Sequence, residues 1–120
     1  MGKIRGGPPL TVRTIMIGSR AVRAVEARDL FMALDRAGSL DGWFADRSRR
    51  YGMERGRDWI SVPSPERGGR SVRLLTLPAA MEIVCRDRGT NLKALRDGLA
   101  EAMSVPADAK DARISERLGK

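Results

Sequence analysis

The sequence lacks histidine altogether and contains a single cysteine, Cys85. Imidazole general bases, histidine-containing metal sites, Cys–His dyads and intrachain disulfides are therefore excluded. The chain also has neither a Walker phosphate loop nor a dinucleotide-binding glycine motif, and its carboxylates do not cluster as a hydrolase pair requires. We therefore expect a protein without enzymatic activity, bound cofactor or metal ion.

Long apolar runs and aromatic residues are scarce as well. No stretch approaches the roughly 20 apolar residues that a membrane span needs, and residues 1–10 have no apolar run resembling a signal peptide. We expect a cytoplasmic protein in which Cys85 is reduced. Aromatic residues make up 4% of the chain, too few for a surface on which single-stranded bases stack.

Positive charge is what the chain has in excess. Lysine and arginine number 23 against 15 acidic residues, and 19 of these 23 cations are arginine. This balance suits an anionic partner such as nucleic acid, although a coding sequence rich in G and C would also raise the arginine content. The charge is uneven, because residues 1–73 carry a net +7 and residues 74–120 a net +1.

The length of 120 residues, with 42% hydrophobic and 32% charged residues, is typical of one globular domain. Residues 1–10 are rich in glycine and proline, so we expect a flexible arm. Residues 106–120 alternate in charge and are expected to be disordered. The folded domain is therefore predicted over residues 11–105, and no internal repeat is detected.

The first half of this domain predicts a hairpin and two helices. A β-branched run in residues 11–17 indicates a strand, Gly18 and Ser19 a turn, and residues 21–25 the returning strand. Ser39 can cap a second helix that ends at Gly52. The inner faces of the two helices are Ala27, Leu30, Phe31 and Leu34, then Leu40, Trp43, Phe44 and Tyr51. Both a helix-turn-helix and a plain helical hairpin fit this spacing.

The second half predicts another hairpin and two more helices. Residues 59–62 and 71–76 read as strands around a tip broken by glycine and proline. A helix follows from Leu77 to near Gly89, with Pro78 in its first turn and Cys85 on its apolar face, hence in the core. The last helix, residues 91–103, carries a leucine stripe that fits packing on its own domain or a dimer seam. The sequence thus predicts an α+β fold: an N-terminal β-hairpin, a helix-turn-helix-like pair, a second hairpin or wing, and two C-terminal helices.

The basic residues concentrate between the second helix and the second hairpin. Residues 47–73 hold eight arginines against three acidic residues, a net +5. Gly68 and Gly69 would let backbone amides approach phosphate, as in the wing beside a helix-turn-helix, although a solvated loop fits equally well. The candidate contact residues for nucleic acid or a protein partner are Arg47, Arg49, Arg50, Arg57, Arg67, Arg70 and Arg73. The predicted core residues are Leu30, Leu34, Trp43, Phe44, Tyr51, Trp59, Leu77, Met81 and Val84.

Three sequence blocks also occur in a known order. They are Val25–Leu30 (VEARDL) with Leu34; Trp43-Phe44, Arg47 and Tyr51–Ile60 (YGMERGRDWI); and Leu75-Thr76-Leu77 with Ala80, Glu82 and Arg88. In this order and separation the chain resembles the AntA/AntB-type phage antirepressor domain, which is related to the KilA-N and Bro-N domains of viral regulators. The resemblance implies a prophage-type regulator that relieves repression by binding a repressor protein. The alternative is a regulator that contacts duplex DNA through its basic helix and wing.

Overall fold

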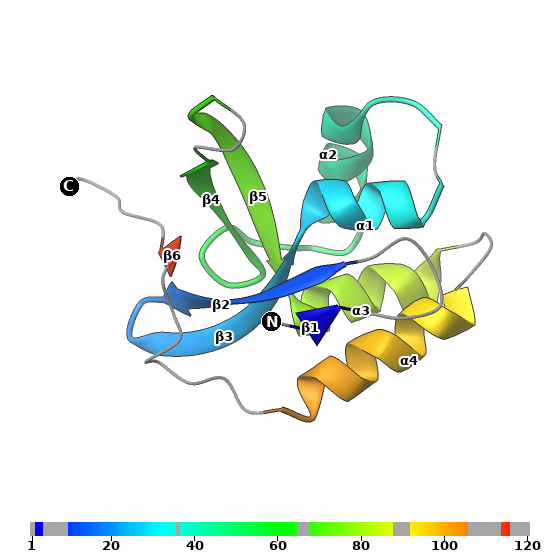
Figure 1. Ribbon diagram of the computed structural model, residues 1–120. Helices are drawn as coiled ribbons and strands as arrows, with labels where there is room; N and C mark the ends of the chain where they lie inside the picture. The colour runs from blue at the N-terminus through cyan, green and yellow to red at the C-terminus, as the bar shows by residue number, and fades with distance from the viewer. Residues whose placement is uncertain are drawn as a thin grey trace.

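The computed structural model describes residues 2–3, 10–35, 37–64, 68–87, 92–105 and 114–115. The elements are β1 (Gly2–Lys3), β2 (Thr11–Ile17), β3 (Arg20–Glu26), α1 (Ala27–Ala33), α2 (Leu40–Arg50), β4 (Trp59–Ser64), β5 (Arg70–Thr76), α3 (Leu77–Arg86), α4 (Leu92–Met103) and β6 (Ile114–Ser115). This is the predicted α+β fold, with two hairpins and two pairs of helices in the expected order (Figure 1).

One antiparallel sheet in the order β2-β3-β5-β4 forms the centre of the molecule. The short strands β1 and β6, which lie in the predicted arm and tail, both pair with β2. Leu10 is fully buried, which moves the start of the fold one residue into the predicted arm. The rest of the arm and tail lies outside the described residues.

Local sequence signals determine where α2 and α3 begin and where α2 ends. The Oγ of Ser39 accepts a hydrogen bond from the Gly42 amide at 3.0 Å and caps α2. Gly52 follows the helix with φ of +63°, a left-handed conformation that ends helices and favours glycine. Thr76 caps α3 through the Ala79 amide, and Pro78 lies in the first turn, where its missing N–H is not needed.

The structure contains an internal repeat that the sequence analysis missed. The first unit is β2, β3, α1 and α2, and the second is β4, β5, α3 and α4. Where β3 and β5 pair, Val25 faces Leu75, Ala24 faces Thr76 and Glu26 faces Leu74. The pairing has a two-fold centre at Val25 and Leu75. Each residue of β3 is equivalent in the repeat to the residue of β5 whose number is 50 higher, so that Arg23 is equivalent to Arg73. Three equivalent positions carry the same residue type in both units: Arg20 and Arg70, Val22 and Val72, and Arg23 and Arg73.

The repeat is hidden in the sequence because only the strands retain identical residues. Their helices share apolar character at matching positions, such as Leu30 with Ala80 and Leu34 with Val84, but not residue type. The loops differ too: two residues, Gly18 and Ser19, join β2 to β3, whereas five residues, 65–69, join β4 to β5. A search for sequence periodicity therefore finds little, while the pairing register shows the relation directly.

The main core lies between the sheet and the helices. It contains Leu30, Leu34, Trp43, Phe44, Leu77 and Val84 as predicted, and Tyr51, Trp59 and Met81 pack against it while half-buried. A smaller cluster fills the opposite face of the sheet. Its buried members are Ile15, Ala24, Ile60, Val62 and Leu74. Successive side chains of a strand point to opposite faces of the sheet, so Val25 and Leu75 lie in the main core and their neighbours Ala24 and Leu74 in the smaller cluster.

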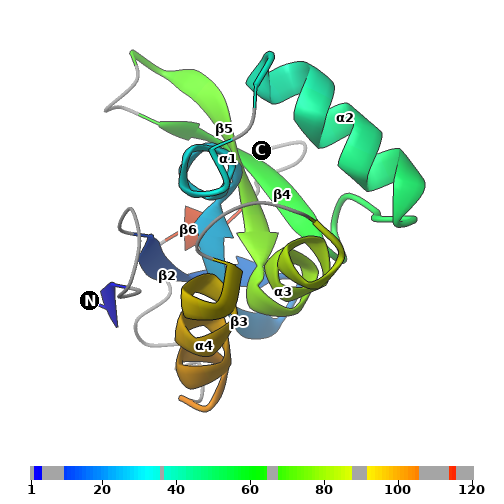
Figure 2. The same ribbon diagram turned by 90° about the vertical axis from the view of Figure 1, so that its right-hand side faces the viewer.

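The second helix pair closes on itself. Leu95 and Leu99 of α4 are fully buried in the main core, so the leucine stripe packs on its own domain and not in a dimer seam. The same packing corrects the prediction for Cys85, which is exposed. The buried face of α3 is centred on Ala80, Ile83 and Val84, and Cys85 projects beyond its edge. Figure 2 shows α3 and α4 side by side.

The helix α2 instead packs beside the second hairpin (Figure 2). Its Phe44 ring meets the Trp59 ring of β4 edge-on at 5.0 Å between centroids, and its Trp43 meets Phe31 of α1 at 5.3 Å. The helix of the first unit thus stabilises the strands of the second. No helix in the part of the chain that the structure describes is long and apolar enough to cross a membrane.

Candidate partner-binding surface

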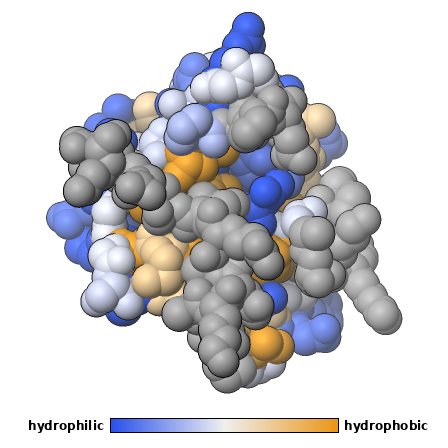
Figure 3. Space-filling view, turned by 60° about the vertical axis from the view of Figure 1, so that its left-hand side comes forward, coloured by the Kyte–Doolittle hydropathy of each residue, from blue (hydrophilic) through white to orange (hydrophobic). Residues whose placement is uncertain are grey.

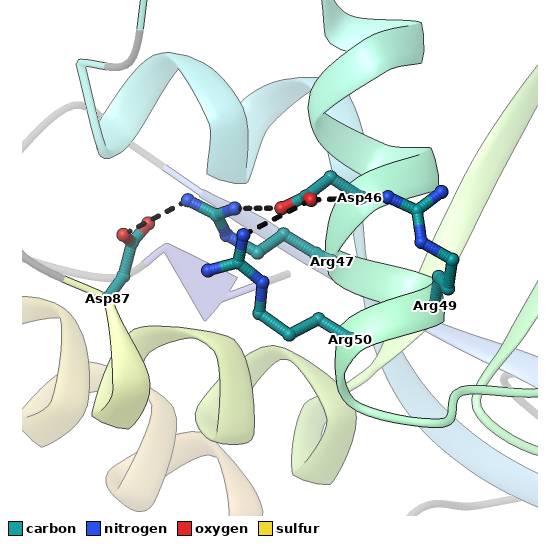
Figure 4. A network of polar contacts seen from close by, with 5 residues as sticks. All are labelled: Asp46, Arg47, Arg49, Arg50 and Asp87. Carbon is teal, nitrogen blue, oxygen red and sulfur yellow. Dashed lines mark hydrogen bonds and ion pairs between the residues drawn. The ribbon is translucent and has the colours of Figure 1, made fainter.

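The arginines of α2 are paired with acidic residues of the same chain. Arg47 is buried with 9% of its surface exposed, and it forms ion pairs with Asp46 and with Asp87 at the end of α3, the latter at 3.3 Å. Arg49 and Arg50 lie 3.5 and 3.3 Å from the same Asp46 carboxylate (Figure 4). Arg47 is therefore a structural residue that joins α2 to α3, and its burial removes it from the exposed candidates.

This cluster of cations changes the titration of Asp46. Partial desolvation raises the pKa of the carboxyl, but the hydrogen bond from Arg47 and the charges of Arg50, Arg47 and Arg49 outweigh it. The pKa of Asp46 consequently lies below its ordinary value. One carboxylate thus offsets part of the positive charge that the sequence assigned to the end of α2.

Two further candidates also have partners within the chain. Arg57 pairs with Asp58 at 2.8 Å and donates to the carbonyl oxygen of Gly52 at 2.9 Å, which holds the loop before β4. Arg73 of β5 pairs with Asp41 of α2 at 2.8 Å, and its guanidinium lies 4.8 Å from the centroid of the Phe44 ring. Both side chains therefore have a fold-stabilising role in addition to any contact they make.

Of the remaining two candidates, Arg67 lies outside the described residues. Arg70 is exposed at the end of β5 and has no ion pair within the described part of the chain. Gly68 and Gly69, next to it, both have positive φ and are exposed, as the wing prediction requires. Of the seven arginines, Arg70 is thus the one that the structure describes as exposed and without an acidic partner.

The sequence analysis overlooked three arginines that also have no acidic partner among the described residues. Arg20 and Arg23 lie on β3 and Arg28 begins α1, all in the first unit. Arg20 and Arg28 are exposed, whereas the Nε of Arg23 is buried without a hydrogen-bond partner. The R-x-V-R sequence shared by residues 20–23 and 70–73 is the signal that could have revealed Arg20 and Arg23.

The repeat places these residues in two equivalent clefts. The α1 cleft, of about 380 Å³, is formed by the start of α1, by β5 and by the first turn of α2. The α3 cleft, of about 370 Å³, is formed by the start of α3, by β3, by the loop before β4 and by the end of α4. Each cleft thus joins the R-x-V-R strand of one unit to the helix start of the other.

The α3 cleft has a cationic rim and an apolar wall. Its lining includes the arginines Arg20, Arg23 and Arg57 together with the apolar side chains of Met103 and Val105. Met103 and Val105 are 43% and 49% exposed, and they are two of the three large hydrophobic residues that lie exposed in the described part of the chain. Figure 3 shows a face on which hydrophobic residues emerge among hydrophilic ones. A surface that combines arginine with exposed apolar residues suits protein contacts.

No family model, no curated protein sequence and no solved structure matches this chain. The resemblance to the antirepressor domain therefore remains a hypothesis based on the three sequence blocks. The fold and the two clefts stand independently of it.

Proposed function

We propose that this protein is a cytoplasmic, non-enzymatic regulator of transcription that relieves repression by binding a repressor protein. The observation that carries the proposal is the α3 cleft, where Arg20 and Arg23, which have no ion pair with any described residue, lie beside the exposed side chains of Met103 and Val105. The three sequence blocks add the regulatory context, since they resemble an antirepressor domain. Protein interfaces are enriched in arginine and apolar anchors at their centre, whereas a phosphate backbone is bound by cations without an apolar wall.

The loss of free cations on α2 also supports a protein target. A helix that reads duplex DNA places its basic side chains against phosphate and base edges. Here Arg47, Arg49 and Arg50 all share Asp46, so the exposed end of α2 carries less free charge than its sequence indicates.

The test is a titration of the purified chain with the repressor that is encoded in the same genetic element. The proposal predicts a saturable complex, visible by light scattering or calorimetry, and release of the repressor from its operator as the complex forms. A repressor that keeps its operator affinity at all concentrations of the chain would overturn the proposal.

Duplex DNA is the second candidate, because Arg70, Gly68 and Gly69 form an exposed hairpin end. Fluorescence anisotropy with the upstream duplex and a scrambled duplex, at several salt concentrations, tests this candidate. Each phosphate contact should add about −0.9 to the slope of log affinity against log salt. A steep slope with preference for the upstream duplex would place DNA ahead of the repressor, and absence of binding near physiological salt would eliminate it.

A further inference from the structure

The α1 cleft contains an intramolecular contact that serves as a template. Asp41 and Phe44 lie three residues apart on α2, which places them on one face of the helix. Both reach Arg73 of β5: the Asp41 carboxylate at 2.8 Å, and the Phe44 ring at 4.8 Å from the guanidinium carbon. One arginine thus recognises an acidic residue and an aromatic residue from a single helical turn.

The α3 cleft offers the equivalent arginine without that contact. Arg23 occupies the position of Arg73 in the repeat, and its Nε is buried with no hydrogen-bond partner. Arg23 has no ion pair within the part of the chain that the structure describes. The helix α4 does not supply the missing turn, because it packs along α3 and contributes only Met103 and the following Val105 to the cleft.

The lining of the α3 cleft complements the same pair of side chains. Arg20 adds a second guanidinium to the lining, with no ion pair in the described part of the chain, while Asp58, the one carboxylate among the lining residues, is held by Arg57 at 2.8 Å. Met103 and Val105, which are 43% and 49% exposed, provide apolar surface against which an aromatic ring can pack. Desolvated arginine gains most from a carboxylate, because the guanidinium fork matches its geometry.

We propose that the α3 cleft binds a helical segment of the partner protein that presents an acidic side chain and, three residues further on, an aromatic side chain. This inference rests on the proposed function and specifies the chemistry of the partner. Arg23 binds the carboxylate and lies against the ring, as Arg73 does with Asp41 and Phe44 in the α1 cleft. The helix α2 is therefore an internal copy of the ligand turn.

The test uses a fluorescent, alanine-rich helical peptide that opens with residues 39–44 (SLDGWF) and is titrated with the full chain. We expect saturable binding that Arg23→Gln weakens by about tenfold or more, since a buried charge pair is lost. Arg28→Gln is the matched control: it removes the same charge from an exposed arginine of the α1 cleft and should change the affinity less than about twofold. A peptide with Asn for Asp should lose the same factor on the wild-type chain and nothing further on Arg23→Gln.

Two outcomes would overturn the inference. Equal losses from Arg23→Gln and Arg28→Gln would mean that only net charge matters, and binding that ignores the Asn peptide would mean that no carboxylate is recognised. If Arg23→Gln fails to fold by circular dichroism, Arg20→Gln at the exposed end of β3 replaces it, with a smaller expected loss.

The same variants titrated with the repressor separate this inference from the proposed function. If the Arg23→Gln variant still binds the repressor as the wild type does, the inference about the α3 cleft is wrong, while the proposed function is unaffected. Absence of repressor binding by the wild-type chain, together with specific binding of the peptide, sinks the proposed function alone.

Discussion

The two units of this protein begin alike and end differently. Each places an R-x-V-R strand beside the helix start of the other unit, around a two-fold centre at Val25 and Leu75. In the second unit α4 folds back along α3, whereas in the first unit α2 meets α1 through Trp43 and also packs Phe44 on the opposite hairpin. The difference teaches that the second helix of a unit decides whether the cleft on the other hairpin receives an acidic partner from within the chain.

The largest effect should come from the junction that both units share. Leu75→Ala empties a fully buried position in the main core and should lower the free energy of unfolding by about 2–5 kcal/mol. Met32→Ala, at a side chain that is 60% exposed, is the control and should change it by less than about 0.5 kcal/mol. Urea unfolding should show one transition, and two separate transitions in the variant would mean that the units fold independently.

The attachment of α2 to α3 should be nearly as sensitive. Arg47→Met leaves the Asp87 carboxylate, whose side chain is 5% exposed, without this cation and should cost about 3 kcal/mol. Arg49→Met removes the same charge two residues further along α2, where the side chain is 79% exposed, and should cost less than about 0.5 kcal/mol. The combined Arg47→Met and Asp87→Leu variant should recover most of the loss. Equal costs for Arg47 and Arg49 would contradict the buried pair.

A smaller effect should separate the two equivalent arginines. Arg73→Gln loses the ion pair with Asp41 and the contact with Phe44. Because the Arg73 and Asp41 side chains are 33% and 83% exposed, the cost should be about 1 kcal/mol. Arg23→Gln loses no ion pair with a described residue and should leave the free energy of unfolding within about 0.5 kcal/mol. Denaturant midpoints of the two variants measure the contrast, and a larger loss at Arg23 would show that the α3 cleft already has an internal partner.

The smallest effect concerns pH. The pKa of Asp46 is lowered in the fold, so its ionised form stabilises the protein above the pH at which a free aspartate ionises, and this contribution disappears as the pH falls through the lowered pKa. Asp46→Asn should therefore be less stable than the wild type at about pH 7, and the gap should narrow towards about pH 3. A gap that stays constant in urea midpoints at both pH values would exclude the titration of Asp46 as its cause.

Much of the fold could be predicted because its signals are local. The apolar spacing of Leu30 and Leu34, the cap at Ser39 and the glycine at Gly52 each act within one or two helical turns. The pairing of β3 with β5 and the burial of Leu10 could not be predicted, because both depend on contacts between segments far apart in the chain. Cys85 shows the same limit, since the position of α4 decides which side of α3 is covered.

The candidate contact residues were predicted from the density of arginine in the sequence. This density does not show which arginines form ion pairs within the chain. Arg47, Arg49 and Arg50 share one carboxylate that lies beside them in the sequence, and Arg73 meets Asp41, which is 32 residues away. Arg20 and Arg23 were not among the candidates, although residues 11–25 carry three arginines and no acidic residue. The shared R-x-V-R sequence and the register of β3 and β5 together show that Arg23 matches Arg73.

The central claim is that the α3 cleft is the open counterpart of the α1 cleft. The most direct measurement is a series of amide ¹H–¹⁵N spectra of the full chain during titration with the peptide that carries residues 39–44. The account predicts that shifts concentrate at Arg20, Arg23, Leu77 and Met103, while the signals of Asp41 and Arg73 remain in place. Shifts centred on Asp41 and Arg73, with Arg23 unchanged, would contradict it.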